Sequence, residues 1–191
     1  SHYGNLAIML PLITGVEELR EVKSMLREIM AEFDRADVPY DKELQVGVMI
    51  ETPAAALIAD ILAAEADFFS IGTNDLTGYT LAVDRGNANV EYLYSTYSPA
   101  VLRAIRQVIT AAKSAGIPVG MCGEAAADPL LIPLLLAFGL DEFSVTPTSI
   151  LSTRRAISGW TKAAAEALAE KVMSLDTEQH VVSELKKHIT E

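Results

Sequence analysis

Five short apolar segments recur along the 191-residue chain, and each is followed by a segment with helical periodicity. The apolar segments are continuous runs rather than alternations of apolar and polar residues. Such runs are typical of strands that are buried on both faces of a parallel sheet. They cover residues 6–13, 46–50, 67–72, 118–122 and 142–145. The strand–helix order, repeated five times, predicts an α/β fold with a parallel sheet covered by helices.

The segments between these strands show the signals of amphipathic helices. Apolar residues recur at spacings of three and four, Thr52-Pro53 is a good helix start, and Gly116 and Gly139 are good helix ends. Residues 76–97 predict a mixture of loop and short helix. Helices are expected over residues 15–33, 52–64, 98–115, 128–138, 149–157, 162–173 and 177–188.

Two architectures fit this order of elements. One is an open, doubly wound sheet, and the other is part of a (β/α)8 barrel, which normally needs about 250 residues. The hydrophobic periodicity does not distinguish the two architectures. No Gly-x-Gly-x-x-Gly, the usual mark of a dinucleotide site, follows the first strand, and its absence weakly disfavours the doubly wound sheet.

Composition narrows the class of protein further. The 15 Lys and Arg residues against 26 Asp and Glu residues give a net charge of −11, which disfavours nucleic acid as a partner. The single Cys122 cannot form an internal disulfide, and no apolar run reaches the roughly 20 residues of a membrane span. We therefore expect a cytoplasmic protein. Residues 1–5 lack the features of a signal peptide and are expected to be linker or added residues.

Polar residues stand where the predicted strands end, which is where ligands bind in either architecture. Glu51 and Asp75 would face a common crevice, and their negative charges would repel unless a cation such as Mg²⁺ lay between them. Both residues also precede predicted helices, where a carboxylate serves equally well as a helix cap. From spacing alone the two interpretations are about equally good.

Two further residues, Arg85 and Cys122, allow two interpretations each. Arg85 could hold a phosphate or a carboxylate, but the neighbouring Asp84 could instead form an ordinary surface ion pair with it. Cys122 could be an inert buried thiol or a proton donor in a cleft. No role is assigned to the histidines, which are His2, His180 and His188.

At this point three motifs become recognisable. Residues 67–87, DFFSIGTNDLTGYTLAVDRGN, resemble the signature of the phosphoenolpyruvate-utilising enzymes. Residues 48–56, VMIETPAAA, and residues 120–124, GMCGE, are similar to those of one branch, the Enzyme I family of the bacterial sugar phosphotransferase system. The resemblance extends over the chain from Leu6 onward.

The resemblance implies a (β/α)8 barrel in which this single, incomplete domain, residues 1–191, supplies about the last five units, strands four to eight. It also implies that Glu51 and Asp75 hold Mg²⁺ and that Asn74, Asp75 and Arg85 bind phosphoenolpyruvate. Cys122 would be the catalytic acid that protonates the enolate of pyruvate. One departure is Gly78, where the family signature usually carries Gln.

The family also implies partners that lie outside this chain. The phosphoryl acceptor would be a histidine on a separate upstream domain, which passes phosphate to the carrier protein HPr for sugar uptake, and the barrel domain would form a homodimer. We expect the 191-residue chain alone to be unable to complete phosphotransfer. The alternatives are a dimerisation module without catalysis, or an enzyme of the pyruvate phosphate dikinase, phosphoenolpyruvate synthase or metal-dependent aldolase type.

Overall fold

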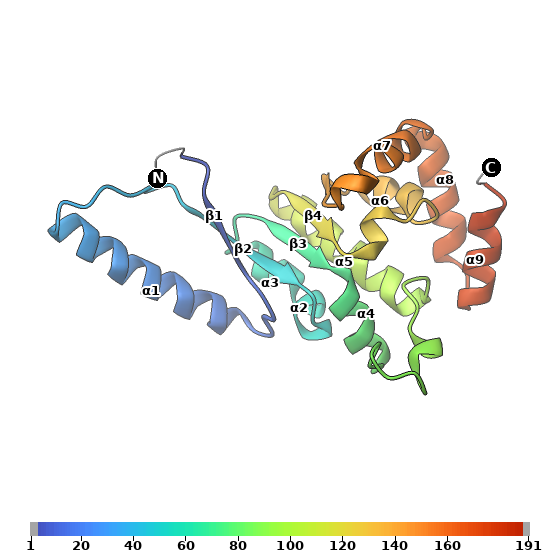
Figure 1. Cartoon of the computed structure of the whole chain (residues 1–191), viewed down its shortest axis with the longest axis horizontal. Helices are drawn as coiled ribbons and strands as arrows, with labels where there is room; N and C mark the ends of the chain where they lie inside the picture. The colour runs from blue at the N-terminus through green and yellow to red at the C-terminus, as the bar shows by residue number, and fades with distance from the viewer. Residues whose placement is uncertain (1–3, 189–191) are drawn as a thin grey trace.

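The computed structural model describes residues 4–188 and contains a parallel sheet of five strands. The strands are β1 (Ala7–Leu10), β2 (Gln45–Ile50), β3 (Phe69–Gly72), β4 (Val119–Cys122) and β5 (Glu142–Phe143). Their order in the sheet is the same as their order in the chain (Figure 1). A doubly wound sheet reverses its order at a switch point. This sheet has no reversal among its described strands, and the predicted α/β class is confirmed.

The helices follow the predicted order with shifted boundaries. The predicted helix over residues 52–64 is divided at Ile58, whose backbone angles depart from helical values, and the helix expected from residue 128 begins only at Ile132. The described helices are α1 (Val16–Arg35), α2 (Pro53–Leu57), α3 (Ala59–Ala63), α4 (Thr73–Leu81), α5 (Pro99–Ala115), α6 (Ile132–Phe138), α7 (Ile150–Ser158), α8 (Lys162–Met173) and α9 (Glu178–Lys186), with short 3-10 turns η1 (Glu91–Leu93), η2 (Glu124–Ala127) and η3 (Pro147–Ser149).

The two faces of the sheet differ in the side chains they carry. Side chains alternate across a strand, so one face of β2–β4 carries large apolar residues that are fully buried against the helices. They are Val48, Ile50, Phe69, Ile71, Val119 and Met121. The opposite face carries small or polar residues, among them Gly47, Ser70, Gly72, Gly120 and Cys122. The strands therefore look uniformly apolar in sequence, but the opposite face of β3 and β4 carries only small or polar side chains, and that of β2 carries Met49 beside Gly47.

The first strand–helix unit is more exposed than its sequence predicts. Leu6, Met9 and Leu12, in or beside β1, are between 40% and 59% exposed, so the prediction that this strand is buried on both faces is wrong. The cause is that β1 is an edge strand, with β2 as its single neighbour in the described sheet. In α1, Met25 and Ile29 are also exposed, and this helix lies at the opposite end of the molecule from α7–α9 (Figure 1).

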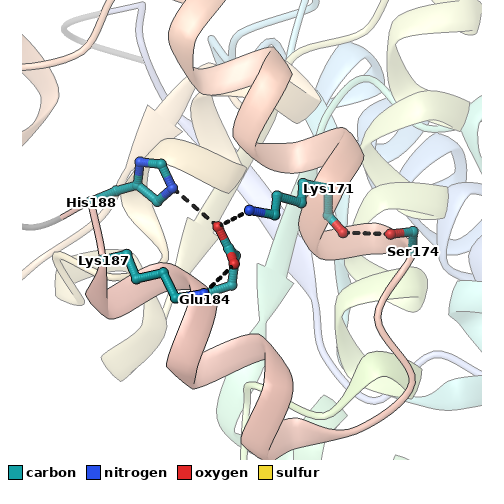
Figure 2. Close-up of polar contacts among 5 residues, drawn as sticks. All are labelled: Lys171, Ser174, Glu184, Lys187 and His188. Atoms are coloured by element: carbon teal, nitrogen blue, oxygen red, sulfur yellow. Dashed lines mark hydrogen bonds and ion pairs between the residues drawn. The ribbon is translucent and has the colours of Figure 1, made fainter.

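The C-terminal helices are held together by a nearly buried carboxylate. Glu184 of α9 is only 5% exposed, and its oxygens contact Lys171 Nζ of α8 at 2.6 Å, Lys187 Nζ at 2.9 Å and His188 Nε2 at 3.2 Å (Figure 2). Hydrogen bonds from Lys171, Lys187 and His188 lower the pKa of Glu184 to about 2. His188 was assigned no role from sequence, and here it contacts Glu184, four residues earlier in the chain.

No helix within residues 4–188 combines the length and apolarity needed to cross a membrane.

Candidate functional site

The predicted site residues lie at the carboxyl ends of three neighbouring strands. Glu51 directly follows β2, Asn74 and Asp75 lie in the first turn of α4 after β3, and Cys122 is the last residue of β4. Because β2, β3 and β4 are adjacent and parallel, their ends share one edge of the sheet. Arg85 reaches this region from the loop that follows α4.

Glu51 does not act as a helix cap. The cap of α2 is Thr52, whose Oγ1 accepts a hydrogen bond from the backbone N–H of Ala55 at 3.0 Å. The Glu51 side chain, only 4% exposed, instead accepts a 2.8 Å hydrogen bond at Oε1 from the N–H of Leu12, beyond the end of β1. Of the two interpretations left open by the sequence, the cap is therefore wrong for Glu51.

Leu12 holds its N–H toward Glu51 in an unusual conformation. Its φ is 53°, in the left-handed region that costs a non-glycine residue roughly 1 kcal/mol or more. Such conformations persist where surrounding contacts hold them, and they concentrate at functional sites. No sequence signal marks Leu12, because an ordinary leucine in an apolar run gives no indication of positive φ.

The Glu51 carboxylate carries an uncompensated charge. Burial raises its pKa above the usual value, and the negative charge of Asp75 raises it further, while the Leu12 N–H opposes the shift. Among the ion pairs of residues 4–188, none involves Glu51. A cation between Glu51 and Asp75 would relieve this repulsion.

The donor set at Glu51 and Asp75 fits a hard divalent cation. The part of the chain that the structure describes contains no cluster of three or more His, Cys, Asp or Glu residues suited to a metal. Mg²⁺ is commonly held by one or two carboxylates, with water and substrate oxygens completing its coordination, so two are sufficient. Gly72 provides room for the arrangement, because a Cβ there would lie 2.7 Å from Glu51 Oε2.

Asn74 is oriented by contacts from two directions. Its side-chain Oδ1 accepts a 3.4 Å hydrogen bond from the N–H of Glu124, and its carbonyl accepts a 3.0 Å hydrogen bond from the hydroxyl of Tyr94. With the amide oxygen directed at Glu124, the amide NH₂ is left to donate to a bound anion. Tyr94 was missed by the sequence analysis, since it lies 20 residues from its partner.

Asn74, Asp75 and Arg85 line one cavity of about 480 Å³. Asp84 does not form the expected surface pair with Arg85; its Oδ1 accepts a 2.8 Å hydrogen bond from the N–H of Gly86. Among the described ion pairs Arg85 has no partner, so its guanidinium is available to an anion. The cavity is completed by Gly78, Tyr79, Ala82, Val83 and Asp84.

Cys122 is half-buried and is held close to β3. Its Sγ lies 3.8 Å from Ser70 Oγ and 3.7 Å from the carbonyl oxygen of Ile71, and its own carbonyl accepts a 3.0 Å hydrogen bond from Thr73 Oγ1. The next residue, Gly123, has a φ of 98°, and a Cβ there would collide with Thr73. The chain turn after Cys122 therefore requires glycine.

A larger groove lies elsewhere on the molecule. It measures about 950 Å³ and is bordered by Leu57, Arg103, Arg106 and Met173, among other residues of α2, α3, α5 and α8. Neither this groove nor the 480 Å³ cavity is lined by Glu51 or Cys122, which flank the cavity at the adjoining strand ends. Size alone would thus point to a place that contains none of the predicted site residues.

Residues 1–161 match the family model described as "PEP-utilising enzyme, PEP-binding domain". The chain therefore belongs to the PEP-utilising enzymes, and it carries their PEP-binding domain.

Relatives named phosphoenolpyruvate-protein phosphotransferase, an enzyme, are similar over almost the whole chain. The one from Bacillus subtilis is 50% identical over 187 residues, which are 98% of this chain and 33% of the relative. The relative from Geobacillus stearothermophilus is 51% identical over 187 residues, which are 98% of this chain and 32% of the relative. The relative from Buchnera aphidicola is 45% identical over 183 residues, which are 96% of this chain and 32% of the relative. The chain spans about a third of the length of these relatives.

Two solved structures are similar in fold. A citrate lyase from Burkholderia xenovorans superimposes with a TM-score of 0.55 at 18% identity, over 95% of this chain and 62% of its own. RipC from Yersinia pestis superimposes with a TM-score of 0.55 at 16% identity, over 86% of this chain and 68% of its own. At such identities the likeness concerns the fold alone.

Proposed function

We propose that this chain is the phosphoenolpyruvate- and Mg²⁺-binding part of a phosphoenolpyruvate–protein phosphotransferase. The five strands would be the last five, strands four to eight, of a (β/α)8 barrel. The observation that carries the proposal is the convergence of Asn74, Asp75 and Arg85 on one cavity beside the buried, unpaired Glu51. The names of the relatives from three bacteria favour this enzyme over a dikinase or a synthase.

The electrostatics of the site suit an anionic substrate in an otherwise acidic chain. The unpaired Arg85 would grip the phosphate with two parallel hydrogen bonds, and the Asn74 amide would donate a third. The first-turn N–H groups of α4 add partial positive charge near the same point. When bound by Glu51 and Asp75, Mg²⁺ would neutralise the negative charge that develops on phosphate and enolate oxygens.

Cys122 would complete the reaction after phosphoryl transfer. Loss of the phosphoryl group leaves the enolate of pyruvate, whose carbon–carbon double bond supplies the electron pair for a new C–H bond. The thiol gives its proton to that carbon, and the sulfur keeps the S–H electron pair as a thiolate. The half-buried position of Cys122 at a strand end suits this role, because the sulfur is reachable from the sheet edge.

The remaining parts of the cycle would lie in other segments or molecules. We propose that the phosphoryl acceptor is a histidine on an upstream domain, that HPr receives the phosphate for sugar uptake, and that the enzyme is a cytoplasmic homodimer. Since this chain spans about a third of its relatives, we expect it to bind phosphoenolpyruvate without turning it over.

Calorimetric titration of phosphoenolpyruvate, with and without Mg²⁺, tests the proposal. We expect binding that requires Mg²⁺ and that is lost in Glu51→Gln and Asp75→Asn. Glu43→Gln is the matched control, because Glu43 is exposed and lies just before β2. Binding that is the same with and without Mg²⁺, or that survives in Glu51→Gln, would contradict the proposed site.

A second candidate function is an assembly module without catalysis. It is favoured by the exposed apolar residues of β1 and α1, which include Met9, Met25 and Ile29, and by the open edge of β1. Tight self-association in analytical ultracentrifugation, together with no binding of phosphoenolpyruvate at any Mg²⁺ concentration, would favour this function over the first.

A further inference from the structure

Two tyrosines of the segment between α4 and α5, residues 82–98, reach different parts of the site. The hydroxyl of Tyr94 donates to the carbonyl oxygen of Asn74 at 3.0 Å. The hydroxyl of Tyr97 donates to the carboxylate of Asp128, which directly follows η2. Burial raises the pKa of both tyrosines, so both hydroxyls keep their protons and remain donors at neutral pH.

The turn η2 is held by hydrogen bonds at both of its ends. At its start, the N–H of Glu124 donates to Asn74 Oδ1 across 3.4 Å. At its end, one oxygen of Asp128 accepts from the Tyr97 hydroxyl, and the other accepts from the N–H of Leu130 at 2.9 Å. Each oxygen of the carboxylate therefore has a donor, and Asp128 joins η2 to the segment before α5 and to the approach to α6.

These contacts close a ring that begins and ends at Asn74, here called the Asn74 ring. From the Asn74 side chain the ring passes to Glu124 and along η2 to Asp128. There it crosses to Tyr97, and it returns through Tyr94 to the Asn74 carbonyl. A closed ring restricts the freedom of all its members together, so the loss of one link loosens the others.

We propose that Tyr97 is a positioning residue for Asn74. By holding Asp128 in place, it fixes the course of η2 and thereby the N–H group that orients the Asn74 amide. Tyr97 is not among the residues that line the cavity of Asn74 and Arg85, so it acts through the ring and not on the substrate. The assignment rests on the proposed function for the anion that Asn74 would bind, but the ring itself stands without it.

The start of η2 needs an anchor of this kind. Gly123, which precedes it, has a φ of 98° and the conformational freedom of glycine, and Glu124 itself is exposed. The 3.4 Å bond from Glu124 to Asn74 is long, so by itself it fixes neither partner. Without the anchor, the Asn74 amide would be free to turn over and present its oxygen to an anion in place of its NH₂.

A double-mutant cycle on the affinity for phosphoenolpyruvate tests the ring. Tyr97→Phe and Tyr94→Phe each remove one hydroxyl, and we expect each to weaken binding by about three- to fivefold in calorimetry. Because either substitution opens the same ring, the affinity of the double variant should lie within about twofold of that of the single variants. Losses that multiply in the double variant, or unchanged affinity in Tyr97→Phe, would overturn the assignment.

Further variants separate the hydrogen bond from packing. Tyr92→Phe is the matched control, because Tyr92 lies in the same segment and is 77% exposed, and its loss of a hydroxyl should leave the affinity unchanged. Asp128→Ala removes the acceptor and should reproduce the loss in Tyr97→Phe. Asp128→Asn keeps the link, since its NH₂ can donate to the Tyr97 oxygen, and should bind within about twofold of the unaltered chain. Full affinity in Asp128→Ala overturns the assignment, as does an equally weak Asp128→Asn.

Amide NMR of the chain without ligand distinguishes this inference from the proposed function. In Tyr97→Phe we expect shifts in the backbone resonance of Glu124 and the side-chain NH₂ resonances of Asn74, although the Tyr97 hydroxyl bonds to neither residue. Tyr92→Phe should move none of these resonances, and unmoved resonances in Tyr97→Phe would overturn the assignment. If the unaltered chain fails to bind phosphoenolpyruvate, the proposed function fails, while the resonances still decide whether Tyr97 holds Asn74 through η2.

Discussion

Two nearly buried carboxylates, Glu51 at the sheet edge and Glu184 between α8 and α9, are exposed to almost the same small extent. Glu184 is surrounded by Lys171, Lys187 and His188, and these partners lower its pKa to about 2 (Figure 2). Glu51 has one backbone N–H and a neighbouring carboxylate, and its pKa is raised. The two carboxylates are equally buried but oppositely compensated. Glu184 joins two helices, whereas Glu51 is the group that we propose to bind a cation.

The largest expected effect comes from filling the space beside Glu51. In Gly72→Ala the added methyl would lie 2.7 Å from Glu51 Oε2 and 2.8 Å from its Cβ, so the carboxylate must move. Since a small displacement of a positioned group is costly, we expect affinity for Mg²⁺ and phosphoenolpyruvate to fall by about tenfold or more in calorimetry.

Gly159→Ala is the matched control for Gly72→Ala. A Cβ at Gly159, after α7, would contact only backbone oxygens at ordinary distances of 3.4 Å and beyond. Unchanged affinity in Gly72→Ala would show that the position of the Glu51 carboxylate does not matter for binding.

The second-largest expected effect is a loss of thermal stability when the charge of Glu184 is removed. Glu184→Gln removes the charge that Lys171 and Lys187 share, so we expect Tm at pH 7 to fall by several degrees while binding of phosphoenolpyruvate is unaffected. Because the folded-state pKa is depressed, this stabilisation is present above the usual value of 4.5 and is lost as the pH falls toward 2.

Thermal melts from pH 7 to pH 2 therefore check the sign of the Glu184 effect. The difference in Tm between Glu184→Gln and the unaltered chain should shrink below pH 4.5, whereas the exposed Glu170→Gln should show little difference at any pH. A difference that grows on acidification would contradict the depressed pKa.

The smallest expected effect is a gain in stability. With a raised folded-state pKa, ionised Glu51 destabilises the cation-free fold, and the penalty grows as the pH rises above 4.5. We expect Glu51→Gln without divalent cations to raise Tm at pH 7 by about one to three degrees. The gain should shrink as the pH falls below 4.5, where the carboxyl becomes protonated in both states; a loss of stability at pH 7 would contradict the raised pKa.

The sequence predicted the arrangement of strands well, because a parallel sheet imposes continuous apolar runs whose ends are easy to locate. Once the strands were placed, Glu51, Asn74, Asp75 and Cys122 followed as residues of the sheet edge. The expectation that β1 is buried on both faces failed, since burial depends on neighbours that the described chain does not supply.

The contacts that refine the site were not predictable from local patterns. The Leu12 N–H reaches Glu51 across 39 positions of sequence, and the Ser70 hydroxyl reaches Cys122 across 52. Neither residue type signals such a contact, although Ser70 is the only polar residue between Phe68 and Ile71 and could have been noticed. His188 likewise gave no signal, because its partner Glu184 resembles any helix-surface glutamate in sequence.

We propose that the uncompensated carboxylate of Glu51 binds a divalent cation. Thermal melts in MgCl₂, against NaCl at matched ionic strength, test it directly, because a ligand that binds only the folded state raises Tm. We expect Mg²⁺ to raise the Tm of the unaltered chain and of Glu184→Gln but to leave the Tm of Glu51→Gln unchanged. A Mg²⁺-dependent rise in Glu51→Gln as large as in the unaltered chain would contradict it.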